Sequence, residues 1–257
     1  GMLMAADSIP DRMVISLKGK SALYKGDLMM LEMVANANWT RPIYVALTVG
    51  QENYMNLGDN FVQEGLANRI TPFTTKEEGA KNFDTAKTYD NVMNKFKFGG
   101  VSQKGIYLDE TVMRMCYTHR RLFASLAQHL VDEGQTEKAK KVLDKCEKEL
   151  PDYNIPHDYQ SGSVDLARCY AKTGQNDKAQ KLIDELWLKS SQYLVWYMAF
   201  DGSRFASTQH DCLIHFYILE QLLNVQDMVN KDKSDKKEEQ LNSLMVIYQS
   251  KEGGADE

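Results

Sequence analysis

The feature that most constrains this chain is a phrase that occurs twice, first in residues 120–153 and again 40 positions later. Each copy has an apolar segment of helical period, a Gly-Gln pair and a second periodic segment. The matching pairs are Leu126-Ala127 with Leu166-Ala167, Gly134-Gln135 with Gly174-Gln175, and Lys138-Ala139 with Lys178-Ala179. Because repetition at a fixed period is the signature of stacked supersecondary units, the sequence predicts a stack of helical hairpins.

The residue types in each copy follow the tetratricopeptide pattern of 34 residues. Small residues let two helices approach closely, glycine turns the chain, and proline ends the second helix. The pattern also requires large apolar residues that pack between the helices. In the first copy the positions of the pattern are occupied by Phe123, Leu126, Ala127, Leu130, Gly134, Ala139, Leu143, Cys146 and Pro151. The second copy departs from the pattern at Ser163, Leu186 and Ser191. Two copies are fewer than a stable array needs, so we expect a third helical pair, at 207–225 and 236–248, to cap the stack together with the N-terminal part.

The N-terminal part reads as a small α/β domain with a mostly parallel sheet. Branched and apolar runs predict strands, helical spacing predicts helices between them, and strand–helix–strand order is typical of a crossover unit. The expected strands are residues 12–18, 43–49 and 66–73, and the expected helices are 27–37, 55–63 and 86–95. Asp27 and Asp109 are the expected N-caps of the helices that follow them. The fold class is therefore α+β overall, with an α/β domain at 1–105 and an all-α tetratricopeptide-like domain at 106–257.

Composition excludes several classes of function. The formal charge is -5 with both signs interleaved, which argues against a nucleic-acid partner. No apolar run approaches the ~20 residues of a membrane span, so we expect no membrane insertion by this chain itself. The four cysteines form no C-x-x-C pair, which disfavours zinc. We expect them to be buried thiols, with a Cys146–Cys169 disulfide as the alternative.

No constellation of residues indicates catalysis. The chain lacks the phosphate-binding glycine motifs and the G-x-S-x-G elbow. Asp211 and His215 share a helix face, but we expect a surface polar pair there rather than a metal site. We therefore predict no catalytic, cofactor or metal residues and no enzyme activity for this chain. The rival hypothesis is an enzyme with a small-molecule or sugar-phosphate site at the strand ends near Gly50 and Asn53.

The helical repeats predict a surface for a protein or peptide partner. Tetratricopeptide arrays bind peptides on the concave face made by the first helix of each hairpin. The repeat register places five polar side chains there, namely Arg121, Gln128, Asp132, Arg168 and Lys172. The three cations among them would suit an acidic peptide or a C-terminal carboxylate. The alternative is that all five are ordinary solvated helix residues.

Several segments together resemble a family of large bacterial membrane proteins. They are LMMLEMVANANWTRPIYVALTVG, NYMNLGDNFVQEGLANRITPF and GIYLDETVMRM, followed by the repeats, and N-W-x-R-P-I-Y at residues 38–44 is the most distinctive part. In that family this region is the C-terminal soluble part, and the membrane-embedded half is similar to GT-C glycosyltransferases of the protein O-mannosyltransferase kind.

The resemblance implies an extracytoplasmic, periplasmic domain of an inner-membrane protein whose catalytic carboxylate lies in the membrane half. We therefore expect a non-catalytic interaction domain that binds or positions acceptor protein or a partner. The remaining alternative is a structural domain that packs against its own membrane half.

Overall fold

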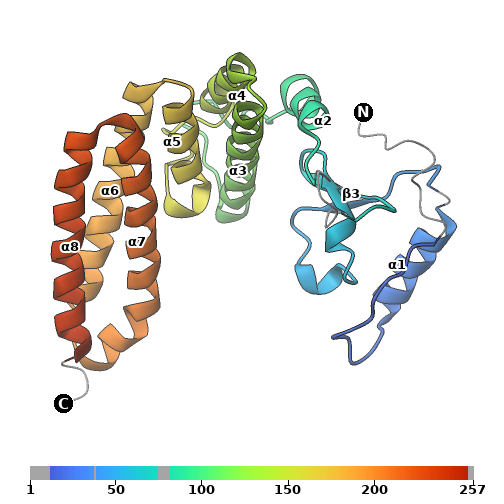
Figure 1. Cartoon of the computed structure of the whole chain (residues 1–257), viewed down its shortest axis with the longest axis horizontal. Helices are drawn as coiled ribbons and strands as arrows, with labels where there is room; N and C mark the ends of the chain where they lie inside the picture. Colours follow the sequence, from blue (N-terminus) through green and yellow to red (C-terminus); the bar gives the residue numbers. More distant parts are fainter. Residues whose placement is uncertain (1–11, 38, 75–81, 254–257) are drawn as a thin grey trace. The chain divides into compact units, whose positions relative to one another are not determined.

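The computed structural model describes residues 12–37, 39–74 and 82–253, and the chain divides into two compact units, 1–96 and 97–257. The first unit contains a small sheet and the second is a stack of helices, so the fold is α+β as predicted (Figure 1). This division falls upstream of the predicted boundary after residue 105.

The sheet of the first unit is antiparallel, so the prediction of a mostly parallel sheet was wrong. Its strands are β1 (Tyr44–Ala46), β2 (Phe61–Gln63) and β3 (Ala67–Ile70), in the order β1-β3-β2. Val45 pairs with Asn68, and Val62 pairs with Arg69. The cause is a hairpin that the periodicity did not reveal: residues 61–63 form a strand rather than the end of a helix, and Gly65, with φ of 101°, turns the chain back into β3.

Two other predictions for this unit need correction. Residues 12–18 form no strand, and the apolar run 43–49 contributes only three residues to the sheet. Residues 12–18 pair with no strand of the described sheet. The apolar side chains of residues 13 and 15 instead pack against the core cluster of this unit. That cluster consists of Val34, Met55, Leu57, Phe61 and Ile70.

The helix predicted at 27–37 is present as α1 (Lys25–Asn36), but it begins two residues earlier than expected. Its N-cap is Tyr24, so the prediction of Asp27 at that position was wrong. Asp27 is the third helical residue, and its carboxylate accepts hydrogen bonds from the Tyr24 amide (2.9 Å) and the Lys20 Nζ (2.7 Å). A carboxylate in the first turn still satisfies a free N–H group and complements the helix dipole.

Three 3-10 or π turns and one short helix complete this unit. They are η2 (Gln51–Asn53), η3 (Gly58–Asn60), α2 (Thr85–Asp90) and the π turn η4 (Asn91–Lys95). The last two replace the single helix predicted at 86–95. Asp84 caps α2 by accepting a hydrogen bond from the Lys87 amide.

The second unit is the predicted stack of helical hairpins (Figure 1). Its helices are α3 (Glu110–Asp132), α4 (Thr136–Glu149), α5 (Ser163–Lys172), α6 (Asn176–Met198), α7 (Gly202–Val229) and α8 (Lys231–Gly253). The third pair is longer than predicted, and residues 231–240, expected to include a linker, are helical. Asp109 caps α3 as predicted, because its carboxylate accepts a hydrogen bond from the Val112 amide (2.8 Å).

The repeated residues form the seam between the hairpins. Leu126 and Leu143 of the first copy have no exposed surface, nor has Ile183 of the second. Gly134 and Gly174 have nearly the same left-handed φ, 73° and 77°, so both hairpins turn in the same way. The first helices contact one another in order, α3 with α5 and α5 with α7. All four cysteines are free and buried, as expected for the thiols of a helical core.

Arg120 holds the connection between the first two hairpins. Its guanidinium is fully buried and donates hydrogen bonds to the carbonyl oxygens of Leu150, Ile155 and Pro156. Ile155 and Pro156 belong to the six residues, 154–159, that lengthen the 34-residue unit to a period of 40, and Leu150 is the C-cap of α4 just before them. The extra residues are therefore fixed by one side chain that starts the first repeat.

Candidate functional site

All five predicted groove residues lie on the first helices of the hairpins, three on α3 and two on α5, and we call the face that these helices share with α7 the predicted inner groove. On α3, Gln128 donates a hydrogen bond to the Asp132 carboxylate (2.6 Å). The same carboxylate lies 3.7 Å from the Lys172 Nζ of α5. The structure therefore brings these three side chains together and connects the first two hairpins through them.

Arg168 connects α5 to α7 in the same way. Its guanidinium pairs with Asp165 one turn earlier and donates a hydrogen bond to the Gln221 Oε1 (3.2 Å). Two of the three predicted cations thus have a carboxylate partner from the chain itself. Exposed pairs of this kind contribute at most about 1 kcal/mol, so a carboxylate from another molecule can exchange with them at little cost.

Arg121 differs from the other two cations because it bonds only to neutral groups within the described part of the chain. It donates hydrogen bonds to the carbonyl oxygen of Gln160 (2.6 Å) and to the Thr118 hydroxyl. Its side chain lies over Gly162, where an added Cβ would come within 2.6 Å of the Arg121 Cγ. Glycine at 162, with φ of 73°, is therefore what lets the arginine lie flat against the start of α5.

Sequence reasoning missed the contribution of α7 to this face. Tyr217 is 61% exposed and lies one helical turn before Gln221, the partner of Arg168. Leu213, 56% exposed, lies one turn before Tyr217. The spacing of four residues was visible in the sequence, but the third hairpin lacks the signature residues that would have set its register. The inner groove is therefore polar and of mixed charge on α3 and α5, and apolar on α7.

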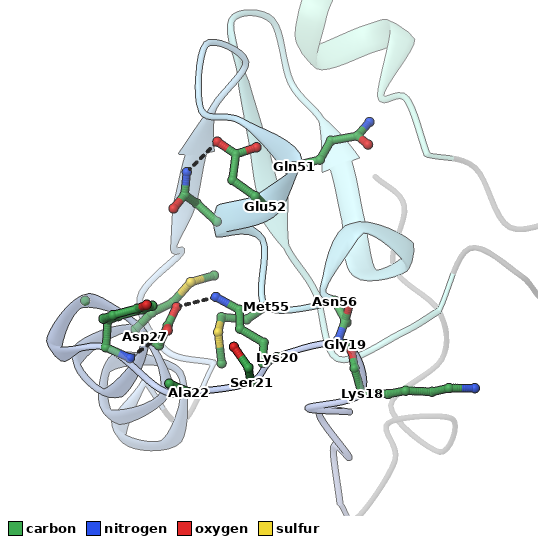
Figure 2. Close-up of a pocket in the computed structure, with 14 residues that line it drawn as sticks. Lys18, Gly19, Lys20, Ser21, Ala22, Asp27, Gln51, Glu52, Met55 and Asn56 are labelled. Carbon is green, nitrogen blue, oxygen red and sulfur yellow. Dashed lines mark hydrogen bonds and ion pairs between the residues drawn. The ribbon is translucent and has the colours of Figure 1, made fainter.

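The first unit has a cavity of about 800 Å³ between the loop 18–22, the start of α1 and the turn η2 (Figure 2). Its walls include Gln51, Glu52 and Asn53, the region where the rival small-molecule site was predicted. Glu52 accepts a hydrogen bond from Asn53 (3.1 Å). Figure 2 shows Lys20 extended from the loop to Asp27 across the same cavity.

The carboxylate of Asp27 in this cavity is held ionised. The hydrogen bonds from Lys20 and from the Tyr24 amide lower its pKa below the ordinary value. A carboxylate with a lowered pKa is a poor proton donor or base near neutral pH. The cavity therefore offers binding groups for a polar molecule, but Asp27 is not poised for acid–base catalysis.

The floor of the cavity has an unusual backbone. Met55 and Asn56 both adopt left-handed conformations, with φ of 51° and 58°. Asparagine tolerates this region, whereas methionine is strained in it. The conformation is fixed because Met55 is buried in the core and Asn56 donates hydrogen bonds to the carbonyl oxygens of Ser16 and Lys18. The cavity is thus preformed by its own loop contacts.

The Asp211 and His215 pair does not form a metal site with its neighbours. His215 is buried and stacks on Tyr193 at 4.8 Å between ring centroids, and burial lowers its pKa. Cys212 is also buried, whereas His210 is exposed. Across the described ranges, no group of three or more His, Cys, Asp or Glu side chains converges as metal ligands. The expected surface polar pair was wrong for His215, which is a core residue.

Comparison with known proteins gives two matches to family models. The tetratricopeptide repeat model matches residues 130–197, which agrees with the hairpins of the second unit. The model of the TMEM260-associated domain 2 matches residues 1–89, which covers most of the first unit. TMEM260 is a membrane-protein family. No curated protein and no solved structure matches the chain.

The repeat prediction is therefore confirmed. The predicted resemblance is confirmed in part, because residues 1–89 match a domain associated with a membrane-protein family. No helix within the described ranges is both long enough and apolar enough to cross a bilayer.

Proposed function

We propose that this chain is a non-catalytic protein-interaction domain that binds a segment of a partner protein in the inner groove of α3, α5 and α7. The observation that carries the proposal is the row of solvent-facing side chains shared by three successive first helices, from Arg121 to Tyr217. Lys172 and Arg168 each form contacts across two helices, so a ligand in the groove would meet side chains already held in place. The exposed Tyr217 supplies an apolar anchor of the kind that dominates interface energies.

Photo-crosslinking in the full-length parent protein tests the groove. A photoreactive residue is placed at Tyr217 in the groove, and at Lys148, which is exposed on the second helix α4, as the matched control. We expect a specific adduct from position 217 and not from 148. Changing Arg121, Arg168 and Lys172 together to glutamate should abolish that adduct.

The identity of the adduct separates the alternatives. A second polypeptide crosslinked at 217 supports the interaction domain. An intramolecular adduct with the membrane half of the parent instead supports the structural alternative. An adduct that forms equally well at both positions, or that survives the triple glutamate change in a folded protein, refutes the groove.

We further propose that the parent is a membrane protein similar to GT-C glycosyltransferases and that this domain lies on the extracytoplasmic side, where it positions an acceptor protein. The match of residues 1–89 to a TMEM260-associated domain supports a membrane parent. The side of the membrane is tested with a topology reporter that is active only outside the cytoplasm, fused at the exposed turn residue Gly134. A reporter that is active only in the cytoplasm refutes the placement.

The cavity of the first unit supports a second candidate function, binding of a small polar molecule such as a sugar phosphate. Its volume of about 800 Å³ is sufficient for such a ligand. A thermal shift with nucleotides and sugar phosphates tests this function, because a ligand that binds only the folded state raises the melting temperature. The Glu52→Gln variant should alter the shift, and a shift that no cavity variant alters refutes binding at this site.

A further inference from the structure

A concave site in the helical unit lies apart from the predicted groove residues. It is a pocket of about 470 Å³ formed by the first half of α3, the connection before α5 and the second half of α6. We call it the aromatic pocket and define it by Tyr117, Pro156, His157, Asp158, Lys189, Gln192, Tyr193 and Trp196. None of the eight belongs to the predicted groove set.

The aromatic rings of this pocket are supported from behind and open to solvent in front. Tyr193 stacks nearly parallel on the buried His215, with ring centroids 4.8 Å apart and an interplanar angle of 15°. Trp196 packs against Tyr197 at 5.1 Å and against Phe200 at 5.3 Å. Tyr193 and Trp196 nevertheless remain 42% and 55% exposed. Rings held in this way present a fixed π surface with little entropy to lose on binding.

Charged groups of both signs surround this pocket: Asp158 lines it, and the buried Arg120 guanidinium lies behind it, donating a hydrogen bond to the carbonyl oxygen of Pro156. The lining residue Lys189 is neutralised, because its Nζ contacts the Glu185 carboxylate and the carbonyl oxygen of His157, both within 2.8 Å. The Asp158 carboxylate accepts a hydrogen bond from the Gln160 amide and, like Asp211, has no ion-pair partner in the described part of the chain.

Both aspartates act on the aromatic groups. Burial raises the pKa of Tyr117 and Asp158 raises it further, whereas the Arg120 guanidinium lowers it. Burial likewise raises the pKa of Tyr197, with Asp211 adding to the effect. His215 supplies no compensating charge near neutral pH, since burial lowers its pKa and keeps the ring neutral.

Elsewhere in this unit, the chain supplies its own cation to aromatic rings. Lys237 lies 4.7 Å from the ring centre of Trp187, and Lys178 lies 5.5 Å from that of Tyr170. Within the described ranges, Tyr193 and Trp196 have no lysine or arginine in such a position. The aromatic pocket thus has exposed π faces and one lining carboxylate, Asp158, that forms no ion pair in the described part of the chain, which are the two groups that a cation site needs.

We propose that the aromatic pocket binds an arginine side chain of a partner polypeptide. A guanidinium is planar and weakly hydrated, so it stacks on Tyr193 or Trp196 while its N–H groups reach the Asp158 carboxylate. An ammonium is a compact, strongly hydrated charge that cannot make both contacts with the same geometry. The site requires no contact in the inner groove, so its failure leaves the proposed function standing, and the reverse also holds.

The proposal is tested by NMR titration of the whole chain with N-acetyl-arginine amide. The neutral control is N-acetyl-citrulline amide, which has nearly the same shape without the charge, and N-acetyl-lysine amide tests the choice of cation. We expect the arginine probe to shift the indole N–H signal of Trp196, leave those of Trp39 and Trp187 in place, and bind more tightly than either control.

Variants locate the site. Trp196→Ala and Asp158→Asn should each weaken arginine binding about fivefold, read from the backbone amides of α6, because each removes one attractive contact with the cation. Leu188→Ala, at an exposed position of the same helix that does not line the pocket, is the matched control and should bind like the wild type. Circular dichroism of each variant confirms that the fold is retained.

Equal binding of arginine and citrulline overturns the proposal, because charge would then contribute nothing. Tighter binding of lysine overturns the assignment to arginine. An unchanged affinity in folded Trp196→Ala places any binding elsewhere and also overturns it.

Discussion

Arg120 offers the sharpest test of how the repeat stack is held together. Its guanidinium is buried, no carboxylate is among its hydrogen-bond partners, and it meets three carbonyl oxygens of the connection between the first two hairpins. Burial lowers the pKa of this group, but it remains charged near neutral pH. We predict that Arg120→Met, which keeps an unbranched apolar stem and removes the guanidinium with its donors, strongly destabilises the helical unit.

The magnitude follows from two opposing effects. Hydrogen bonds from a charged donor contribute on the order of 1.5–3 kcal/mol each, and three are lost. Against this, the variant no longer buries a cation, which costs several kcal/mol in the wild type. The Nε of Arg120 has no hydrogen-bond partner in the described structure, so its removal also lowers the free-energy cost of burial in the variant. The difference leaves a net loss of about 3 kcal/mol in the free energy of unfolding.

Arg121 provides the matched control. It is the adjacent residue of the same type, but it is exposed and donates to the carbonyl oxygen of Gln160 from the surface. Arg121→Met should therefore lose less than about 1 kcal/mol. Both variants are measured by urea unfolding followed by far-UV circular dichroism, which reports mainly the helical unit. If Arg120→Met and Arg121→Met unfold at the same urea concentration, the buried guanidinium does not organise the connection and the reasoning fails.

Three further predictions concern caps, thiols and pH. Asp109→Ala should cost about 1 kcal/mol because α3 loses its N-cap, and an unchanged midpoint in urea would contradict the capping role. Cys146 and Cys169, whose thiol pKa values burial raises to about 12, should react with iodoacetamide only after unfolding; rapid labelling of the native protein would show that the seam opens. Burial lowers the pKa of His157 to about 4, below its ordinary 6.5, so the unfolded state binds the proton more readily and stability should fall as pH drops from about 6.5 to about 4. His157→Gln should flatten that dependence, and an equally steep curve in the variant would refute it.

The two proposed interaction surfaces differ in how far the sequence revealed them. The repeat register placed Gln128, Asp132 and Lys172 on neighbouring helices, and the structure brings them together. It did not show that Lys172 has a partner within the chain, because helix-to-helix pairing depends on how the hairpins cross. The aromatic pocket was invisible for a similar reason: Tyr117 and Trp196 are far apart in sequence and meet only after the connection before α5 has folded between them.

The sheet shows the same limit in the first unit. Residues 61–63 and 67–70 are too short for periodicity to separate strand from helix, and only their mutual pairing, with β1 beside them, makes them a sheet. The predicted parallel order relied on a crossover from residues 12–18 through the helix at 27–37 to residues 43–49, and residues 12–18 form no strand.

The helical hairpins after residue 110 were determined by the sequence alone. Leu, Ala, Gly and Pro at fixed spacing determine local helices, the turns between them and their close packing. Tertiary structure alone decided the direction of the strands, the burial of Arg120 and the set of residues that meets in the aromatic pocket. The physical reason is range: helix formation depends on neighbours within a turn or two, whereas strand pairing, desolvation of charge and pocket shape depend on residues that the chain brings together only when it folds.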